Sequence, residues 1–164
     1  MSRIVKLSIV SATTLFTLFV TVVFIIACNN GNGGESASVN TGTGINFSDK
    51  GLELVAAQSK QENRPVFILA HASYCAACRK MKKSVFPDKE IGNLFNKSFI
   101  NAQVDIESEE GKMMVKDYEI SGTPTLLFLR PDGQVINKSS GFHSKEELIA
   151  LTKGLSFDGK PVCE

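Results

Sequence analysis

The segment HASYCAACRKM, residues 71–81, places Cys75 and Cys78 three positions apart, between an apolar run and a run of basic residues. The preceding run, PVFILAH (65–71), is short and continuously apolar, which is typical of a strand buried on both faces. Arg, Lys and Met after the second cysteine favour a helix. The segment therefore predicts a buried strand that ends just before a helix whose first turns carry both sulfur atoms.

Two cysteines at this spacing suit three kinds of site: half of a zinc site, a structural disulfide, or a pair that exchanges electrons with other thiols. Zinc needs further ligands, and the chain has neither a second CxxC motif nor a close pair of histidines, so we expect no metal. No glycine-rich phosphate loop joins a strand to a helix, and we expect no cofactor.

The predicted helix suits redox chemistry. With Ser73 or Tyr74 near the N-cap, Cys75 lies in the first turn, where free amides and the helix dipole favour a thiolate. The spacing puts Cys78 on the same face. Three residues at core-facing spacing are Cys78, Met81 and Val85. Four basic residues are expected to form a solvated face with a minor, screened effect on the thiols: Arg79, Lys80, Lys82 and Lys83.

The N-terminal part of the 164-residue chain differs from the rest, which is long enough for one domain with a core. The first 27 residues contain Arg3, Lys6 and no acid, and residues 7–27 form an apolar run, which predicts an export signal or a membrane anchor. Its end, Ile25-Ile26-Ala27-Cys28, resembles the lipobox of bacterial lipoproteins. That resemblance implies cleavage before Cys28 and acylation of Cys28; the alternative is an uncleaved signal anchor.

We divide the chain into a signal peptide or anchor (1–27), a lipidated cysteine with a flexible tether (28–45), and a folded domain (46–164). The tether is rich in Gly, Asn, Ser and Thr and offers little to bury. In either interpretation of the N-terminus, we expect a membrane-anchored domain in the cell envelope, outside the cytoplasm and facing the periplasm if the cell is Gram-negative.

The charge balance gives no support for nucleic acid binding. Removing Arg3 and Lys6 from the 18 basic residues leaves 16 against 17 acidic ones, and no basic stripe is present.

Periodicity and turn residues predict the order helix, strand, helix, strand, helix, strand, strand, helix. The first expected helix is capped by Ser48 or Asp49 and has Leu52, Val55 and Ala56 on one face. It is followed by the strand 65–71, the CxxC helix interrupted near Pro87, a short helix 88–96, a strand 98–106, a helix 109–118 and a hairpin around 131–133. The last helix begins with a Ser144–Glu147 capping box and ends at Gly154. A βαβ unit followed by a ββα unit predicts one mixed α/β sheet covered by helices.

The CxxC at the start of a helix after a buried strand, together with SGTPT (121–125) before the next strand, resembles the thioredoxin family over about residues 47–153. The resemblance implies a three-layer fold with a mixed central sheet and helices on both faces. The flanks of YCAAC (74–78) look most like envelope thioredoxins that act on disulfides of exported proteins.

The resemblance also implies roles for particular residues. Cys75 would be the exposed nucleophile and Cys78 the more buried resolving thiol. The Thr123-Pro124 bond would be a cis peptide facing the CxxC, where it would bind substrate together with Tyr74, which replaces the family's usual tryptophan. An ordinary trans bond at Pro124 is the alternative.

Two departures from the family concern the resolving thiol. Leu69 replaces a buried aspartate that helps to move its proton, and a lysine often paired with that acid aligns near Asn101. Proton transfer must then use water, the backbone environment, or His71, which lies on the same strand face as Leu69. We interpret Asp105 as a cap or turn residue.

We therefore predict a thiol-disulfide oxidoreductase that acts on thiols or disulfides of exported proteins, in the reducing direction, as a monomer served by an upstream redox partner. The alternative is a non-catalytic binding or chaperone-like module that uses the same groove. Cys163 is left over, and it can form a mixed disulfide or a dimer, or be incidental.

Overall fold

A computed structural model of the protein describes residues 43–157 and 160–161. The expectations for the signal segment, Cys28 and Cys163 lie outside the described residues. Within the described part, no helix combines the length and apolar character that crossing a bilayer requires.

The described elements follow the predicted order. They are α2 (Leu52–Glu62), β1 (Val66–His71), α3 (Ala76–Ser84), α4 (Lys89–Ser98), β2 (Ile100–Asp105), α5 (Glu109–Asp117), β3 (Thr125–Leu129), β4 (Val135–Ser140), α6 (Lys145–Lys153), β5 (Ser156–Phe157) and β6 (Lys160–Pro161). The short β5–β6 pair was not predicted. The interruption at Pro87, the hairpin, and the Ser144–Glu147 capping box were predicted and are confirmed.

A four-stranded mixed sheet in the order β2-β1-β3-β4 forms the centre of the fold. β1 pairs parallel with β2 and antiparallel with β3, and β3 pairs antiparallel with β4. All of β1 except its last residue is buried, as its continuous apolar run predicts for a strand between two neighbours and two helical layers. The predicted three-layer α/β architecture is confirmed.

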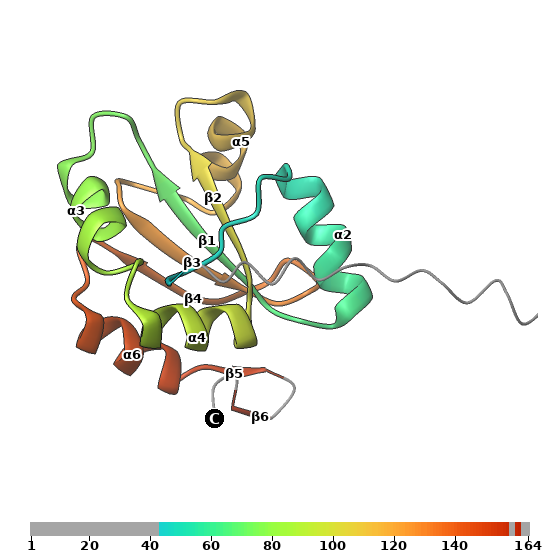
Figure 1. The fold of residues 1–164 in the computed structure, drawn as a ribbon. Helices are drawn as coiled ribbons and strands as arrows, with labels where there is room; N and C mark the ends of the chain where they lie inside the picture. The colour runs from blue at the N-terminus through green and yellow to red at the C-terminus, as the bar shows by residue number, and fades with distance from the viewer. Residues whose placement is uncertain (1–42, 158–159, 162–164) are drawn as a thin grey trace, which may run out of the picture. The chain divides into compact units, whose positions relative to one another are not determined.

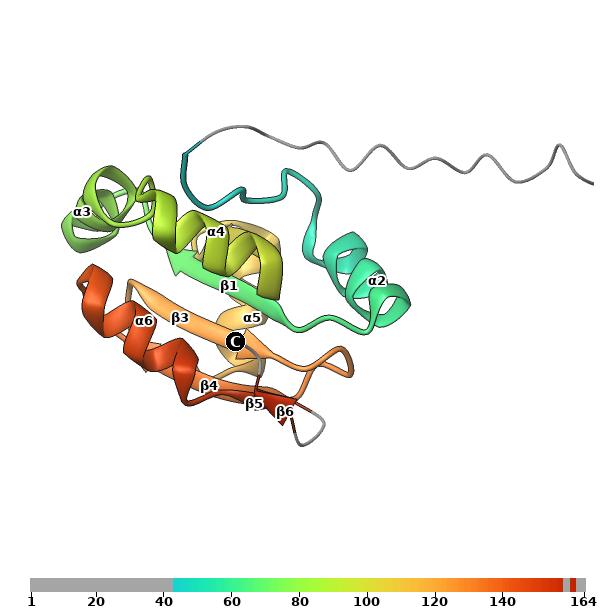
Figure 2. The same ribbon diagram turned by 60° about the horizontal axis from the view of Figure 1, so that its bottom comes forward.

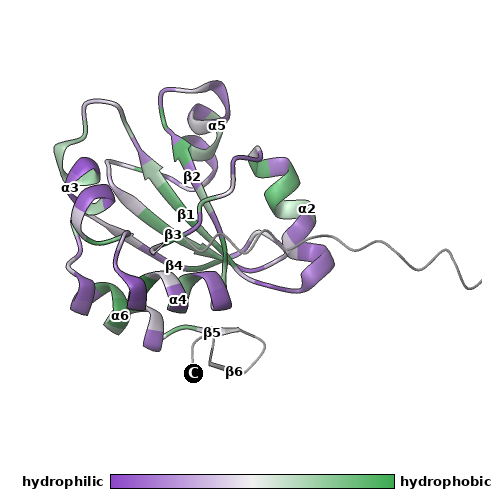
Figure 3. Cartoon of the chain, viewed as in Figure 1, coloured by the Kyte–Doolittle hydropathy of each residue, from purple (hydrophilic) through white to green (hydrophobic). Residues whose placement is uncertain are grey.

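Helices cover both faces of the sheet (Figure 1), and an apolar core lies on each face. On one face, Phe67 and Leu69 pack with side chains of α3, α4 and α6. On the other, Val66, Ile68 and Ala70 pack with α2 and α5. Figure 2 shows α4 and α6 along the first face. Figure 3 shows apolar colouring along the central strands, whereas the helices carry both apolar and polar residues.

The start of α2 differs from the prediction. Its N-cap is Gly51, without a side-chain cap, and the N–H of Leu52 donates instead to Oε1 of Glu110 at 2.6 Å. Ser48 does not cap the helix because its backbone N–H pairs with Asn101 O at 2.8 Å, which holds it beside β2. Ala56 was predicted to face the core and is exposed.

Residues 44–46 contact the domain through their backbone. Ile45 N–H donates to Phe86 O at 2.9 Å, and Asn46 N–H donates to Asn96 Oδ1 at 2.9 Å. Gly44 has φ +120°, and a Cβ on Gly92 would overlap the backbone of Gly44. Both positions therefore need glycine, because any side chain would separate this segment from α4.

Candidate active site

Cys75 and Cys78 form a disulfide at the N-terminus of α3, with an S–S distance of 2.05 Å and Cα atoms 5.3 Å apart. Cys75 is the N-cap residue of this helix, and its Sγ accepts a hydrogen bond from the N–H of Cys78 at 3.0 Å. Amides of a first helical turn favour negative charge on such a sulfur, so a Cys75 thiolate is stabilised here by the backbone.

Two details of the cysteine prediction were wrong. Ser73 and Tyr74 do not cap α3, since Cys75 itself occupies the N-cap. Cys75 was also expected to be exposed, yet only 6% of its surface is accessible, against 2% for Cys78. The cause is that Cys75 Sγ is directed toward the helix end, and both cysteines pack with Ala72. The core-facing position of Cys78 is confirmed.

A hydrogen-bonded bracket holds the loop between β1 and α3. The N–H and Oγ of Ser73 donate to Oε2 of Glu107 at 3.2 and 2.7 Å, and Nη1 of Arg79 donates to Ser73 O at 3.0 Å. The bracket ties the cysteine loop to the loop that follows β2. Sequence reasoning missed Glu107, because nothing local indicates that residues 73 and 107 meet.

The Thr123-Pro124 peptide bond is cis, as the family resemblance implies. Ala70 near the end of β1 pairs with Thr125 at the start of β3. Pro124 therefore lies at the end of the sheet where β1 finishes and the chain continues to Cys75 (Figure 1). The carbonyl of Pro124 accepts from Gly141 N–H at 2.8 Å, which brings the end of β4 to the same edge.

Two large apolar side chains are exposed in the segments that meet at this edge. Tyr74, directly before the first cysteine, is 68% exposed, and Phe142, directly after Gly141, is 37% exposed. The ammonium of Lys80 on α3 lies 4.3 Å from the centroid of the Phe142 ring, so the Phe142 loop and α3 are in contact. Sequence reasoning missed Phe142.

Leu69 is fully buried on the sheet face that α3 covers, and its neighbour on β2 is Gln103. The expected alignment with Asn101 was wrong: Asn101 pairs with Phe67 and donates from Nδ2 to Asn96 Oδ1 at 3.0 Å. The β2 residue beside Leu69 is thus two positions further along the chain than expected. The register of a parallel pair is set by packing of the whole crossover connection, not by a local turn, so the sequence does not reveal it.

His71, the last residue of β1, lies on the same sheet face as Leu69 and pairs with Asp105. Burial lowers the pKa of His71, and the positive charge of Lys82 lowers it further, while Asp105 opposes both effects. Asp105 is a turn residue as expected, because its Oδ1 accepts from Glu107 N–H at 2.9 Å.

Lys82 departs from the expectation of a uniformly solvated basic face. Arg79, Lys80 and Lys83 are exposed, whereas Lys82 is half-buried. Burial lowers the pKa of Lys82, and the charge of Asp105 raises it. The available signal was its spacing, since Lys82 follows the core-facing Cys78 by four residues.

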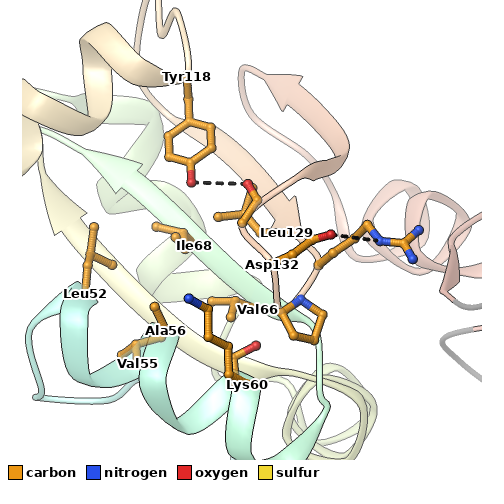
Figure 4. A pocket seen from close by; sticks show the side chains of 13 residues that line it. Leu52, Val55, Ala56, Lys60, Val66, Ile68, Tyr118, Leu129 and Asp132 are labelled. Carbon is orange, nitrogen blue, oxygen red and sulfur yellow. Dashed lines mark hydrogen bonds and ion pairs between the residues drawn. The ribbon is translucent and has the colours of Figure 1, made fainter.

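A separate cavity of about 210 Å³ lies between α2 and the β3–β4 connection, at the start of β1 and the end of β3 (Figure 4). Val66 and Leu129 line it, and Tyr118 donates to Gly133 O at 3.3 Å beside it. It lies at the end of these strands remote from the cysteines. Among residues 43–157 and 160–161, no group of three or more His, Cys, Asp or Glu side chains is placed to hold a metal ion.

A family model described as a thioredoxin-like domain matches residues 52–155, which is most of the described domain. The match includes both cysteines and the Thr123-Pro124 segment.

Among curated proteins, the chain is similar to the thiol:disulfide interchange protein DsbD of two bacteria. It is 27% identical to the Pectobacterium atrosepticum protein over 119 residues, which is 71% of this chain and 20% of the relative. It is 29% identical to the Yersinia enterocolitica protein over 85 residues, which is 51% of this chain and 15% of the relative. The chain thus spans a fifth or less of the length of these relatives.

Among solved structures, the chain resembles a protein described as a candidate disulphide isomerase from Bacteroides thetaiotaomicron, with 28% identity and a TM-score of 0.61 over 68% of this chain and 93% of that one. A thioredoxin from Thermus thermophilus shares the fold at 23% identity, with a TM-score of 0.60 over 66% and 84% of the two chains. The C-terminal domain of Neisseria meningitidis DsbD shares it at 19% identity, with a TM-score of 0.57 over 64% and 92%.

Proposed function

The chain belongs to the thioredoxin-like family and is a thiol-disulfide oxidoreductase with the CxxC pair Cys75–Cys78, and from this premise we propose that it reduces disulfides of exported proteins. The observation that carries the proposal is the position of the pair. Cys75 is the N-cap of α3, where its sulfur accepts the amide hydrogen of Cys78, and the Thr123–Pro124 segment lies at the same edge of the sheet.

The proposed assignment of roles follows from burial. Cys75 retains more accessible surface than Cys78, so Cys75 attacks the substrate disulfide and Cys78 resolves the mixed disulfide. Two electrons then pass from the protein dithiol to the substrate. An upstream thiol donor must reduce the Cys75–Cys78 disulfide again, so the protein needs a redox partner; we propose that it works as a monomer.

The reducing direction is tested by the reduction potential of the Cys75–Cys78 couple, measured by equilibration with glutathione. A reductant of the thioredoxin kind has a potential near about −270 mV, whereas a strong oxidant such as DsbA has about −120 mV. We expect a value below about −220 mV. A value near that of the strong oxidant overturns the direction while leaving the exchange chemistry intact.

We propose that Tyr74, Phe142 and the Thr123–Pro124 segment form the face that binds the substrate polypeptide. Exposed aromatic side chains beside a reactive disulfide supply apolar contact area to a bound chain. An extended substrate segment can pair its backbone with Thr123. This face is specific for polypeptides, since a small disulfide reaches Cys75 without covering either ring.

The Tyr74→Ala variant tests this face. We expect KM for a protein disulfide such as that of insulin to rise about threefold to tenfold, because truncation removes about 0.7–1.4 kcal/mol of contact. The rate with a small aromatic disulfide should stay within about twofold. Met113→Ala is the matched control, since Met113 is a similarly exposed apolar side chain and lies on α5, outside the proposed binding face. Equal losses on both substrates would contradict a binding role.

We propose that residues 1–27 are removed, that Cys28 is acylated, that the polar residues between Cys28 and Gly44 tether the domain, and that the domain faces away from the cytoplasm in the cell envelope. The support is the sequence pattern alone: a basic start, an apolar run, and a cysteine before a polar linker. Labelling cells with a fatty-acid analogue should mark the protein, and Cys28→Ala should abolish the label. Retention of residues 1–27 in the labelled chain would contradict the cleavage.

A further inference from the structure

Three titratable side chains meet between α3 and the face of the sheet on which Leu69 replaces an acid. Two of them come from strands and the third from α3 itself. His71 ends β1, and its register partner Asp105 ends β2. Because side chains alternate along a strand, both lie on the same face as Leu69. Lys82 contributes from α3 and interacts electrostatically with both.

Lys82 and Cys78 share one face of α3. Residues four apart on a helix have Cβ atoms about 5–6 Å apart. Cys78 is 2% exposed and Lys82 is half-buried, whereas the neighbouring Lys83 is exposed, so of these two cations only Lys82 lies on the partly buried side of the helix that carries Cys78. A cation near a thiol in a partly buried site stabilises the thiolate more than a solvated surface lysine does.

An open concavity of about 280 Å³ adjoins the cluster. Lys82 and Gln103 line it, together with Pro87 and residues 43–45 and 47. Gln103 is the β2 neighbour of Leu69, so the concavity begins beside the position of the missing acid. Solvent that enters it reaches Lys82, the one member of the cluster among its lining residues.

We propose that Lys82 acts on the resolving thiol: its ammonium stabilises the Cys78 thiolate, and the imidazole of His71, on the sheet face beneath α3, receives the proton of Cys78. This inference rests on the proposed exchange function and deepens it. The chain thus replaces a buried acid beside the resolving thiol with a cation and a neutral base.

In the proposed resolving step, Cys78 Sγ–H gives its proton to the neutral imidazole of His71. The resulting thiolate attacks Sγ of Cys75 in the mixed disulfide, so the Cys78–Cys75 bond forms and the bond from Cys75 to the substrate sulfur breaks. The electron pair leaves with the substrate sulfur, which takes up one proton. The protein dithiol is oxidised by two electrons and the substrate disulfide is reduced.

The other charges around the cluster are consistent with these roles. Burial and Lys82 lower the pKa of His71, which leaves its imidazole neutral and able to accept a proton near pH 7. Asp105 opposes that shift, and it also opposes the lowering of the Lys82 pKa by burial. Glu107 and Arg79 are engaged with Ser73 in the cysteine loop.

Lys82→Met removes one positive charge from the residue that follows Cys78 by about one helical turn. We expect this loss to raise the thiol pKa of Cys78 by about one unit. The thiolate fraction at pH 7 then falls about tenfold. Thiolate nucleophilicity rises with pKa with a Brønsted coefficient of about 0.4–0.5, which recovers about threefold. The resolving step should therefore slow about threefold at pH 7 and approach the wild-type rate near pH 9.

The experiment uses the full chain in detergent. In a Cys75→Ser background, alkylation of Cys78 is followed against pH by peptide mass spectrometry, which separates it from Cys28 and Cys163. We expect the Lys82→Met profile to move up by about one pH unit and the Lys82→Arg profile to stay near wild type. The control Lys83→Met removes the same charge from the exposed side of α3 and should leave the profile unchanged.

His71→Gln tests the proton acceptor separately. We expect it to slow resolution at pH 7 about threefold or more and to remove the limb of the pH–rate profile due to His71, without moving the Cys78 alkylation profile upward by a unit. If Lys82→Met and Lys83→Met give the same profile, or if Lys82→Arg shifts it as far as Lys82→Met, the inference is overturned. A wild-type chain without exchange activity would instead overturn the proposed function.

Discussion

Replacing Cys78 with Ser is expected to turn Cys75 into a trap that accumulates mixed disulfides with protein partners. The resolving thiol lies three residues away and its sulfur is within bonding distance of Cys75 Sγ, so its removal eliminates an intramolecular step. Oriented intramolecular reactions have effective molarities far above the millimolar concentrations of external thiols. We expect the mixed disulfide to persist at least about a thousandfold longer than in wild type. The measurement is non-reducing electrophoresis of envelope extracts, followed by mass spectrometry.

Two variants define the specificity of this trap. Cys75→Ser with Cys78 intact should capture little, because Cys78 is the less accessible sulfur. Cys163→Ser in the Cys78→Ser background should capture the same partners as Cys78→Ser alone, which excludes the thiol near the C-terminus as the attacking group. If Cys78→Ser captures no partner and the wild-type chain does not turn over a model disulfide, the chain is a binding module rather than an exchange enzyme.

The Phe67→Ala variant is expected to lower the free energy of unfolding by about 3–5 kcal/mol, the range for truncating a large buried aromatic side chain. Phe67 is fully buried at the centre of the core beneath α3, α4 and α6. Its ring centroid lies 4.8 Å from that of Phe95 and 5.1 Å from that of Phe128. Neither ring can refill the space without losing its own contacts. Since domains are stable by about 5–15 kcal/mol, this one change removes a large share of the total.

Urea unfolding of the oxidised protein provides the measurement. The midpoint should fall markedly with little change in the slope, since the surface exposed on unfolding stays similar. Leu54→Ala is the matched control, because Leu54 is 59% exposed on α2 and its loss should cost no more than about 0.5 kcal/mol. A loss below about 1.5 kcal/mol for Phe67→Ala would mean that the core collapses around the cavity.

Local pattern accounts for the elements that sequence reasoning predicted. The continuous apolar run of β1, the proline between α3 and α4, and the Ser144–Glu147 capping box each act within a few residues of chain. Their conformations depend on backbone sterics and short-range hydrogen bonds, which a single segment contains. The start of α2 was misplaced for the opposite reason: Ser48 pairs with β2, and Glu110 binds the first helical amide, both through distant contacts.

The sequence by itself determined that a cysteine pair lies at the N-terminus of a helix after a buried strand, because spacing and periodicity are local properties. Only the tertiary structure decided the surroundings of that pair. The parallel register of β1 with β2 placed Gln103 beside Leu69, and a two-residue shift keeps the same face while moving the side chain about 7 Å along the strand. The packing of α3 on the sheet decided that Lys82, among its neighbouring basic residues, is desolvated near Asp105. Such contacts join residues far apart in the chain, so no local pattern contains them.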